Sequence, residues 1–145
     1  MLPRWHIVLG AIFTFLLWLA LPSTPIIFLV LVFLSSVLID FDHYAAAVHK
    51  TKKLSLQKAL IYHEEEEIKA RKEIEKGIRK KSDFHLFHTI EFHFLIGILS
   101  LLWIGFFYIF LGMVFHSLVD LIDLISKKVI HRREFFLFNW VRKNL

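Results

Sequence analysis

Ionisable side chains inside a long apolar run are the feature that most limits how this chain can fold. Residues 84–125 are almost all apolar, yet the run opens with three histidines and a glutamate. These are His85, His88, Glu91 and His93. At helical spacing, His85, Thr89 and His93 share one stripe, so they can face a common interior rather than lipid. Ionisable groups at membrane depth are usually paired, ligated or functional.

The amino-acid composition indicates an integral membrane protein. Of the 145 residues, 57% are hydrophobic and 16% aromatic, which is too apolar for a soluble domain of this length. We expect an all-α fold, a polytopic membrane helix bundle formed by residues 1–145 as a single domain. The net charge is +5, but the basic residues flank the apolar runs, where anionic lipid headgroups explain them. We therefore expect contact with membrane lipids and no binding of nucleic acid.

The apolar runs predict about four transmembrane helices. They are residues 7–21, 26–39, 85–104 and 106–126. An uncharged turn joins the members of each pair, at residues 22–25 and near Gly105. The second run is short for a span of about 20 residues. A re-entrant hairpin is therefore the alternative for the first pair.

The segments outside these runs carry most of the charge. Residues 44–82 are predicted to form a charged helical insertion, because Glu67 and Arg71 follow the favourable i, i+4 order. Residues 127–145 combine aromatic and basic side chains, which suits the headgroup region of a membrane. Both short turns lack charge. The positive-inside rule then predicts a multi-pass protein of the cell membrane with both termini and the insertion in the cytoplasm.

Three polar motifs meet at the cytoplasmic side in this topology. The first closes the second helix with Asp40, Asp42 and His43, and the second is the histidine-rich start of the third helix. In the fourth helix, a histidine and two aspartates fall at i, i+4 and i+7 on one stripe. They are His116, Asp120 and Asp123. A histidine one turn from an aspartate suits two ligands of one ion, or a ligand and the acceptor that orients it.

We therefore predict one metal site assembled from the three motifs. The predicted ligands are Asp40, Asp42, His43, His85, His88, His93, His116 and Asp120. Asp123 or Glu91 is assigned as a general base or as a residue that orients a ligand. Without cysteine, the ligands must be imidazole and carboxylate, and we expect a divalent metal, zinc or manganese, with enough ligands for two ions. The other histidines lie in basic or interfacial contexts and are predicted to be solvated. They are His6, His49, His63 and His131.

The order of these motifs resembles that of the YdjM-like family of small bacterial and archaeal membrane proteins. The family pattern is Asp-x-Asp-His at a helix end, then His-Arg-Gly-x-Thr-His-Ser, then Gly-x-x-x-His-x-x-x-Asp in a late helix. Residues 40–43 and 112–120 match the first and third elements, whereas the second matches only at His88 and His93. The likeness covers roughly residues 30–125 and implies a membrane-bound metal-dependent hydrolase.

Two functions from different classes fit these observations. The first is a membrane-embedded metal-dependent hydrolase that acts on phosphoester bonds of a lipid-like substrate, since two ions can support phosphoryl chemistry without a protein nucleophile. The second is a metal-ion or proton transporter that uses the same intramembrane histidines and aspartates. A structural adaptor acting through residues 44–82 would leave the buried ionisable groups unexplained.

Overall fold

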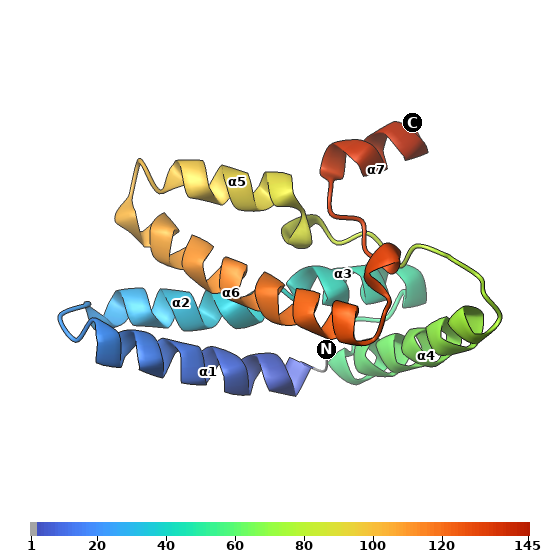
Figure 1. Cartoon of the computed structure of the whole chain (residues 1–145), viewed down its shortest axis with the longest axis horizontal. Helices are drawn as coiled ribbons and strands as arrows, with labels where there is room; N and C mark the ends of the chain where they lie inside the picture. Colours follow the sequence, from blue (N-terminus) through green and yellow to red (C-terminus); the bar gives the residue numbers. More distant parts are fainter. Residues whose placement is uncertain (1–2) are drawn as a thin grey trace.

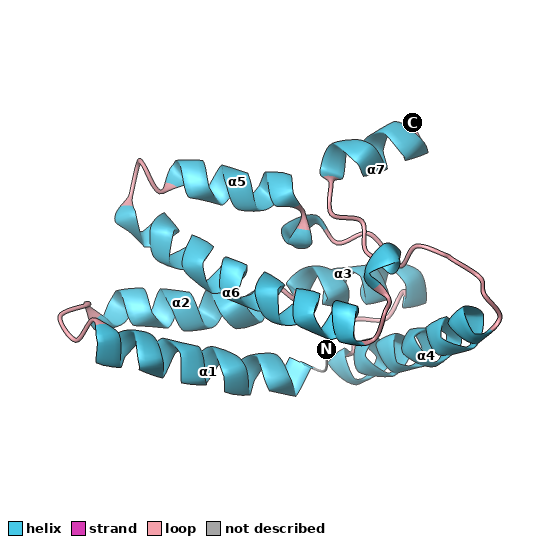
Figure 2. Cartoon of the chain, in the orientation of Figure 1, coloured by secondary structure: helices cyan, strands magenta, loops and turns pink. Residues whose placement is uncertain are grey.

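The chain folds into helices joined by short connections (Figures 1 and 2). This computed structural model describes residues 3–145, and within them no strand is present. The prediction of an all-α fold is therefore confirmed. The α-helices are α1 (Pro3–Ala20), α2 (Ile26–Leu38), α3 (Phe41–Thr51), α4 (Leu56–Glu75), α5 (Ile90–Leu99), α6 (Ile104–Ser126) and α7 (Leu137–Asn144). Two 3-10 turns, η1 (Leu86–His88) and η2 (Ile130–Arg132), complete the structure.

Helices α1, α2 and α6 form the centre of the bundle, and α5 packs on α6. The connections α1–α2 and α5–α6 lie together at one end (Figure 1). Helices α3, α4 and α7 lie toward the other end (Figure 1). The charged segments of the chain therefore gather at one end of the bundle, opposite the two uncharged turns.

Small residues set the closest approaches between the central helices. A Cβ atom added at Gly112 of α6 would clash with the carbonyl oxygen of Val32 and the hydroxyl of Ser35, both in α2. A Cβ atom added at Gly10 of α1 would clash with the hydroxyl of Ser36. Such contacts are typical of membrane helices, where small residues let backbones approach. They bring α1 and α6 against the same end of α2.

Two segments, rather than the four predicted, are long and apolar enough to cross a membrane. They are α6, of 23 residues, and Ile26–Thr51, of 26 residues, in which α2 continues almost directly into α3. Helix α5 has only 10 residues, so its length of about 15 Å is half of a ~30 Å hydrocarbon core. Helix α1 contributes a shorter apolar segment, Trp5–Ala20.

The predicted third helix, residues 85–104, is wrong at both ends for identifiable reasons. At its start the chain forms η1, and α5 begins only after Thr89, whose hydroxyl accepts a hydrogen bond from the N–H of Phe92 at 3.3 Å. At its end the turn falls at residues 100–103 instead of near Gly105. The ring of Trp103 covers Gly105, which becomes part of α6.

The charged insertion consists of two helices instead of one. Helix α3 prolongs α2, and α4 begins after Ser55, whose hydroxyl accepts from the N–H of Lys58. The expected pair between Glu67 and Arg71 is present at 2.8 Å. Helix α4 ends at Glu75, and Gly77, two residues later, adopts a φ of +73° that favours glycine.

Two contacts outside the apolar helices fasten α4 to the rest of the molecule. The hydroxyl of Tyr62 donates to Asp83 at 2.7 Å, and Arg132 in η2 pairs with Glu73 at 3.0 Å. Burial opposes ionisation of Asp83, but the hydrogen bond from Tyr62 and the charge of Lys50 outweigh it and keep the pKa of Asp83 below its usual value. The insertion is thereby held against the segment that leads into η1.

Candidate metal centre

Eight ionisable side chains converge where α1, the α2–α3 junction, η1 and α6 meet. We call this set the His/Asp cluster. Its members are His6, Asp40, Asp42, His43, His85, His88, His116 and Asp120. They form overlapping groups of three whose possible ligand atoms lie within 4.8 Å of one another. The cluster could therefore hold a metal ion, as the three sequence motifs predicted.

The junction between α2 and α3 positions the first motif. Ile39 and Asp40 leave the regular helix, and α3 restarts at Phe41. This break turns Asp40 toward α6 and directs Asp42 toward η1. The carboxylate of Asp42 is buried and accepts a hydrogen bond from the N–H of Phe87 at 2.9 Å. The first and second motifs are thus joined through backbone as well as side chain.

The centre of the cluster is a pair of facing imidazoles. The Nε2 atoms of His88 and His116 are 3.2 Å apart, and both side chains are almost completely buried. The Nδ1 atom of His88 lies 3.1 Å from a carboxylate oxygen of Asp42, and the Nδ1 atom of His116 lies 2.8 Å from the carbonyl oxygen of Ser36. An N–H donated at each Nδ1 leaves both Nε2 lone pairs facing one point. The two lone pairs repel each other there, and a cation at that point would bind both and remove the repulsion.

Two carboxylates surround this point. Oδ1 of Asp40 lies 3.5 Å from Nε2 of His88 and 3.4 Å from Nε2 of His116. Oδ2 of Asp120 lies 3.9 Å and 3.7 Å from the same two nitrogens. Ligands held tetrahedrally at about 2.0–2.1 Å from zinc are separated by about 3.3–3.4 Å. The spacing of these donors is close to that of a zinc site.

Asp42, His43 and His85 form the outer side of the cluster. The rings of His43 and His85 stack with centroids 3.6 Å apart. Oδ1 of Asp42 and Nδ1 of His85 are buried without a hydrogen-bond partner, and they lie 3.8 Å from each other. Buried polar atoms left in this way are uncommon and costly. An ion between them would satisfy both atoms.

The protonation state of His85 suits metal binding. Burial is the largest influence on its imidazole and, despite the opposing charge of Asp42, lowers the pKa of His85 to about 4. The ring is therefore neutral near pH 7, the state in which a histidine ligates a metal.

Asp40 belongs to one possible ligand group with His43 and His88 and to another with His116. It connects the outer and inner sides, so the residues fit one ion or two.

His6 belongs to the cluster although its sequence context predicted a solvated side chain. It is only 3% exposed, its Nε2 lies 3.2 Å from Asp120, and its ring stacks on that of His116 at 4.0 Å. The error arose because the first helix was predicted to begin at residue 7, whereas α1 already contains His6. Gly10 was the available signal, since it lies one turn further on and faces α2.

Arg133 is a second residue that the sequence pattern did not single out. Its Nη2 atom lies 2.6 Å from Oδ2 of Asp120, and only 12% of the side chain is exposed. The segment after α6 returns toward the cluster, where Ser82 donates its N–H to the carbonyl of Arg132 at 2.8 Å. A fixed positive charge therefore stands beside a candidate ligand.

Three predicted site residues are engaged elsewhere. Nδ1 of His93 lies 2.9 Å from the carbonyl oxygen of Thr89, and its Nε2 lies 2.9 Å from the hydroxyl of Ser117. Glu91 accepts hydrogen bonds from the first N–H groups of α7, at Leu137 and Phe138. Asp123 pairs with Lys127 at 2.8 Å. In the described part of the chain, none of His93, Glu91 and Asp123 belongs to a group that could hold a metal.

Comparison with known proteins does not indicate a function, so any functional argument must come from the geometry of the His/Asp cluster. No model of a known protein family, no curated protein and no solved structure matches this chain. The likeness of residues 40–43 and 112–120 to the YdjM-like motifs stays a prediction. The chain is accordingly characterised by an all-helical fold, two helices suited to a membrane, and a buried cluster that could hold a metal.

Proposed function

We propose that the protein is a membrane-embedded metal-dependent hydrolase that cleaves phosphoester bonds of a lipid-like substrate at the His/Asp cluster. The observation that carries this proposal is the facing pair of Nε2 atoms of His88 and His116, 3.2 Å apart and flanked by carboxylates. Zinc and manganese both accept such nitrogen and oxygen ligands. Metal ions bound there would polarise a phosphoryl oxygen and lower the pKa of water.

The surface of the helices supports a membrane setting. Only 28% of the apolar window in Ile26–Thr51 and 22% of that in α6 is buried, unlike the core helix of a soluble protein. The uncharged turns lie at one end of the bundle and the charged segments at the other (Figure 1). Under the positive-inside rule, the end with the cluster and both termini faces the cytoplasm.

The cluster has a side from which a substrate can enter. The side chains of Asp40 and His43 are 20% and 27% exposed, whereas those of His88 and His116 are at most 1% exposed. A phosphoester that entered beside Asp40 would meet the cluster at its more open edge. Arg133 would add a positive charge for an anionic headgroup.

The surroundings of the cluster favour a hydrolase over a transporter. Toward the uncharged turns, the next buried residues of α2 beyond Ser36 are Val32 and Leu29, which are 0% and 4% exposed. A hydrated ion would meet an apolar wall there, whereas a reaction site needs one polar entrance.

The test uses the full chain purified in detergent, stripped of metal and reloaded with Zn²⁺ or Mn²⁺. We expect metal-dependent release of p-nitrophenol from bis(p-nitrophenyl) phosphate, or of headgroup from a phospholipid. Asp120→Ala and His116→Ala should abolish this activity, whereas His49→Ala, which changes an exposed histidine of α3, should retain it.

The same variants separate the two functions. Metal flux into sealed vesicles, lost in Asp120→Ala and His116→Ala and accompanied by no hydrolysis of any phosphoester, would replace the hydrolase by the transporter. Activity that survives in either variant would place the chemistry outside the cluster.

A further inference from the structure

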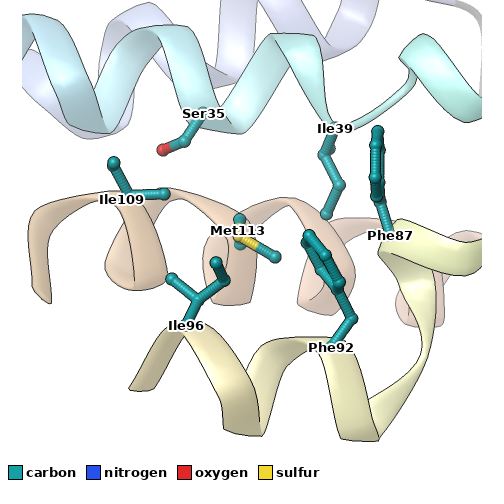
Figure 3. Close-up of a pocket in the computed structure, with 7 residues that line it drawn as sticks. All are labelled: Ser35, Ile39, Phe87, Phe92, Ile96, Ile109 and Met113. Carbon is teal, nitrogen blue, oxygen red and sulfur yellow. The ribbon is translucent and has the colours of Figure 1, made fainter. Parts of the chain in front are cut away.

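An apolar groove runs beside the His/Asp cluster, between α2 and α5 and over α6 (Figure 3). Its volume is about 190 Å³, and it is open along one side. The groove exists because α5 packs on α6 and leaves a space next to α2. No part of the site described above uses it.

One end of the groove is lined by residues that neighbour members of the cluster along the chain. Ile39, Phe87, Phe92 and Met113 line this end (Figure 3). Ile39 immediately precedes Asp40, and Phe87 immediately precedes His88. The N–H of Phe87 also donates to Asp42. A molecule in this end of the groove would therefore lie beside the polar cluster.

The other end lies one helical turn farther from the cluster. It is lined by Ser35 of α2, Ile96 of α5 and Ile109 of α6 (Figure 3). The hydroxyl of Ser35 donates to the carbonyl oxygen of Val32 at 3.1 Å, so its hydrogen-bonding need is met within α2. The groove thus offers hydrocarbon surface along its whole length, and a polar ligand would gain nothing there.

The outward face of α5, the helix that forms one wall of the groove, is apolar. On α5, Phe94, Leu95 and Ile98 are 68%, 50% and 47% exposed. Such a surface belongs in lipid, so hydrocarbon chains would surround the helix that forms this wall of the groove.

We propose that this groove binds one acyl chain of a membrane lipid whose phosphate-bearing headgroup lies at the His/Asp cluster. The inference rests on the proposed function for the headgroup and extends it to the apolar part of the substrate. A water-soluble phosphoester would use the cluster alone, whereas a lipid with an acyl chain fills the apolar groove and the polar cluster together. The substrate class is accordingly a phospholipid or lipid phosphate.

Photo-crosslinking tests occupancy without requiring catalysis. The full chain is reconstituted in phosphatidylcholine vesicles containing a phosphatidic acid that carries a diazirine in its acyl chain. We expect crosslinks on peptides containing Ile96 and Ile109. Ile96→Trp should fill the groove and lower these crosslinks by about tenfold or more, since apolar pockets discriminate even one methylene by about that factor. Leu95→Trp, on the exposed face of the same helix, should leave them unchanged.

Further measurements keep each outcome decisive. Ile109→Trp fills the groove from the opposite wall and should act as Ile96→Trp does, while retained zinc binding reports that each variant is folded. Undiminished crosslinks in both folded variants, or crosslinks confined to outward-facing residues such as Leu95, would overturn the inference. Crosslinks in the groove without hydrolysis of any phosphoester would sink the hydrolase but leave the acyl-chain site. Hydrolysis that is equally fast for substrates with short and long acyl chains, and unchanged in Ile96→Trp, would rule out the acyl-chain site but leave the hydrolase.

Discussion

At the scale of single residues, the positive charge of Arg133 offsets the negative charge of Asp120 when no ion is bound. Its guanidinium lies 2.6 Å from Asp120, whose side chain is only 4% exposed. A bound cation would take over this role, so the arginine and the ion compete for one carboxylate. Such competition makes the arginine stabilising for the ion-free protein and unfavourable for metal affinity.

Arg133→Gln should therefore have opposite effects on stability and metal binding. The ion-free protein should melt at a lower temperature, because removing one partner of a buried ion pair costs about 3–5 kcal/mol. Zinc should restore most of the loss and bind about tenfold or more tightly than to the wild type. Thermal unfolding measures the melting temperature, and competition with a chelator measures the zinc affinity. Arg132→Gln, which changes an arginine paired with Glu73, is the control, and an equal melting-temperature loss with and without zinc in Arg133→Gln would contradict the competition.

His6→Ala tests whether α1 contributes a ligand. We expect zinc affinity to fall by about 10–100-fold, the range seen when groups close to a bound metal are removed. His49→Ala is the matched control, because His49 is exposed. Isothermal titration on both variants gives the comparison. Equal affinities would show that His6 is a packing residue against His116.

Spacing along the sequence predicted which residues of α6 belong together, because His116 and Asp120 are one helical turn apart whatever else the chain does. It could not predict Arg133 or His6, whose positions depend on how the ends of the chain return to the cluster. The prediction of Glu91 or Asp123 as a general base or orienting residue likewise depended on contacts that the sequence does not show. A carboxylate that caps α7 and one that pairs with Lys127 look, in sequence, like catalytic acids.

At the scale of helices, the contact between α2 and α6 determines the geometry of the cluster. The backbone approach at Gly112 lets Nδ1 of His116 reach the carbonyl oxygen of Ser36 at 2.8 Å. That contact orients the Nε2 atom toward His88. The packing of two apolar helices thus decides which nitrogen of His116 is available to a metal.

Gly112→Ala should separate these helices and weaken metal binding. The added methyl group meets the backbone carbonyl of Val32, which cannot rotate away, so we expect a stability loss of about 1–3 kcal/mol and a lower zinc affinity. Gly97→Ala is the control, because there the new Cβ would lie 3.6 Å from the ring of Phe110. It should be neutral or slightly stabilising. A Gly112→Ala protein that unfolds and binds zinc as the wild type does would contradict the role of this contact.

The attachment of α4 should depend on pH through Glu73. The hydrogen bond from Arg132 is the main reason that the pKa of Glu73 lies below its ordinary value of 4.5. A lowered folded-state pKa means that the contact stabilises the protein above the unfolded-state pKa and that this contribution disappears as the pH falls through the folded-state value. Glu73→Gln should thus lower the melting temperature near pH 7, and this difference from the wild type should shrink as the pH falls below 4.5. A difference that persists under acid would rule out this ion pair as its source.

The helices themselves were predictable to different degrees. Helix α6 and the segment from Ile26 onward follow from uninterrupted apolar sequence. Helix α5 is short because Thr89 caps it and η1 draws His88 into the cluster, and neither effect is visible in hydropathy. The division of residues 44–82 into α3 and α4 likewise depends on the continuation of α2 through Asp40.

At the scale of the whole molecule, the cluster is the point that connects otherwise separate parts of the chain. It takes side chains from α1, the α2–α3 junction, η1 and α6. The sequence predicted the convergence of the last three, because their motifs lie at matching ends of apolar runs, but not the contribution of α1. It could not predict the groove beside the cluster, which results from the way α5 departs from α2.

Removal of metal should therefore loosen the bundle as a unit. Three aspartates, Asp40, Asp42 and Asp120, are gathered around largely buried histidines, and a cation that binds only the folded state stabilises it by about 4 kcal/mol when present at a thousandfold excess over its Kd. Treatment with a chelator should lower the melting temperature, and Zn²⁺ should restore it. Hydrogen exchange should increase together in α1, η1 and α6, which all carry candidate ligands.

His116→Ala provides the internal control for this experiment. Without a central ligand, its melting temperature should be lower and insensitive to chelator, while His49→Ala should respond as the wild type does. A wild-type protein that keeps its melting temperature after verified removal of metal, and takes up none on reloading, would show that the histidines and aspartates stabilise one another without an ion.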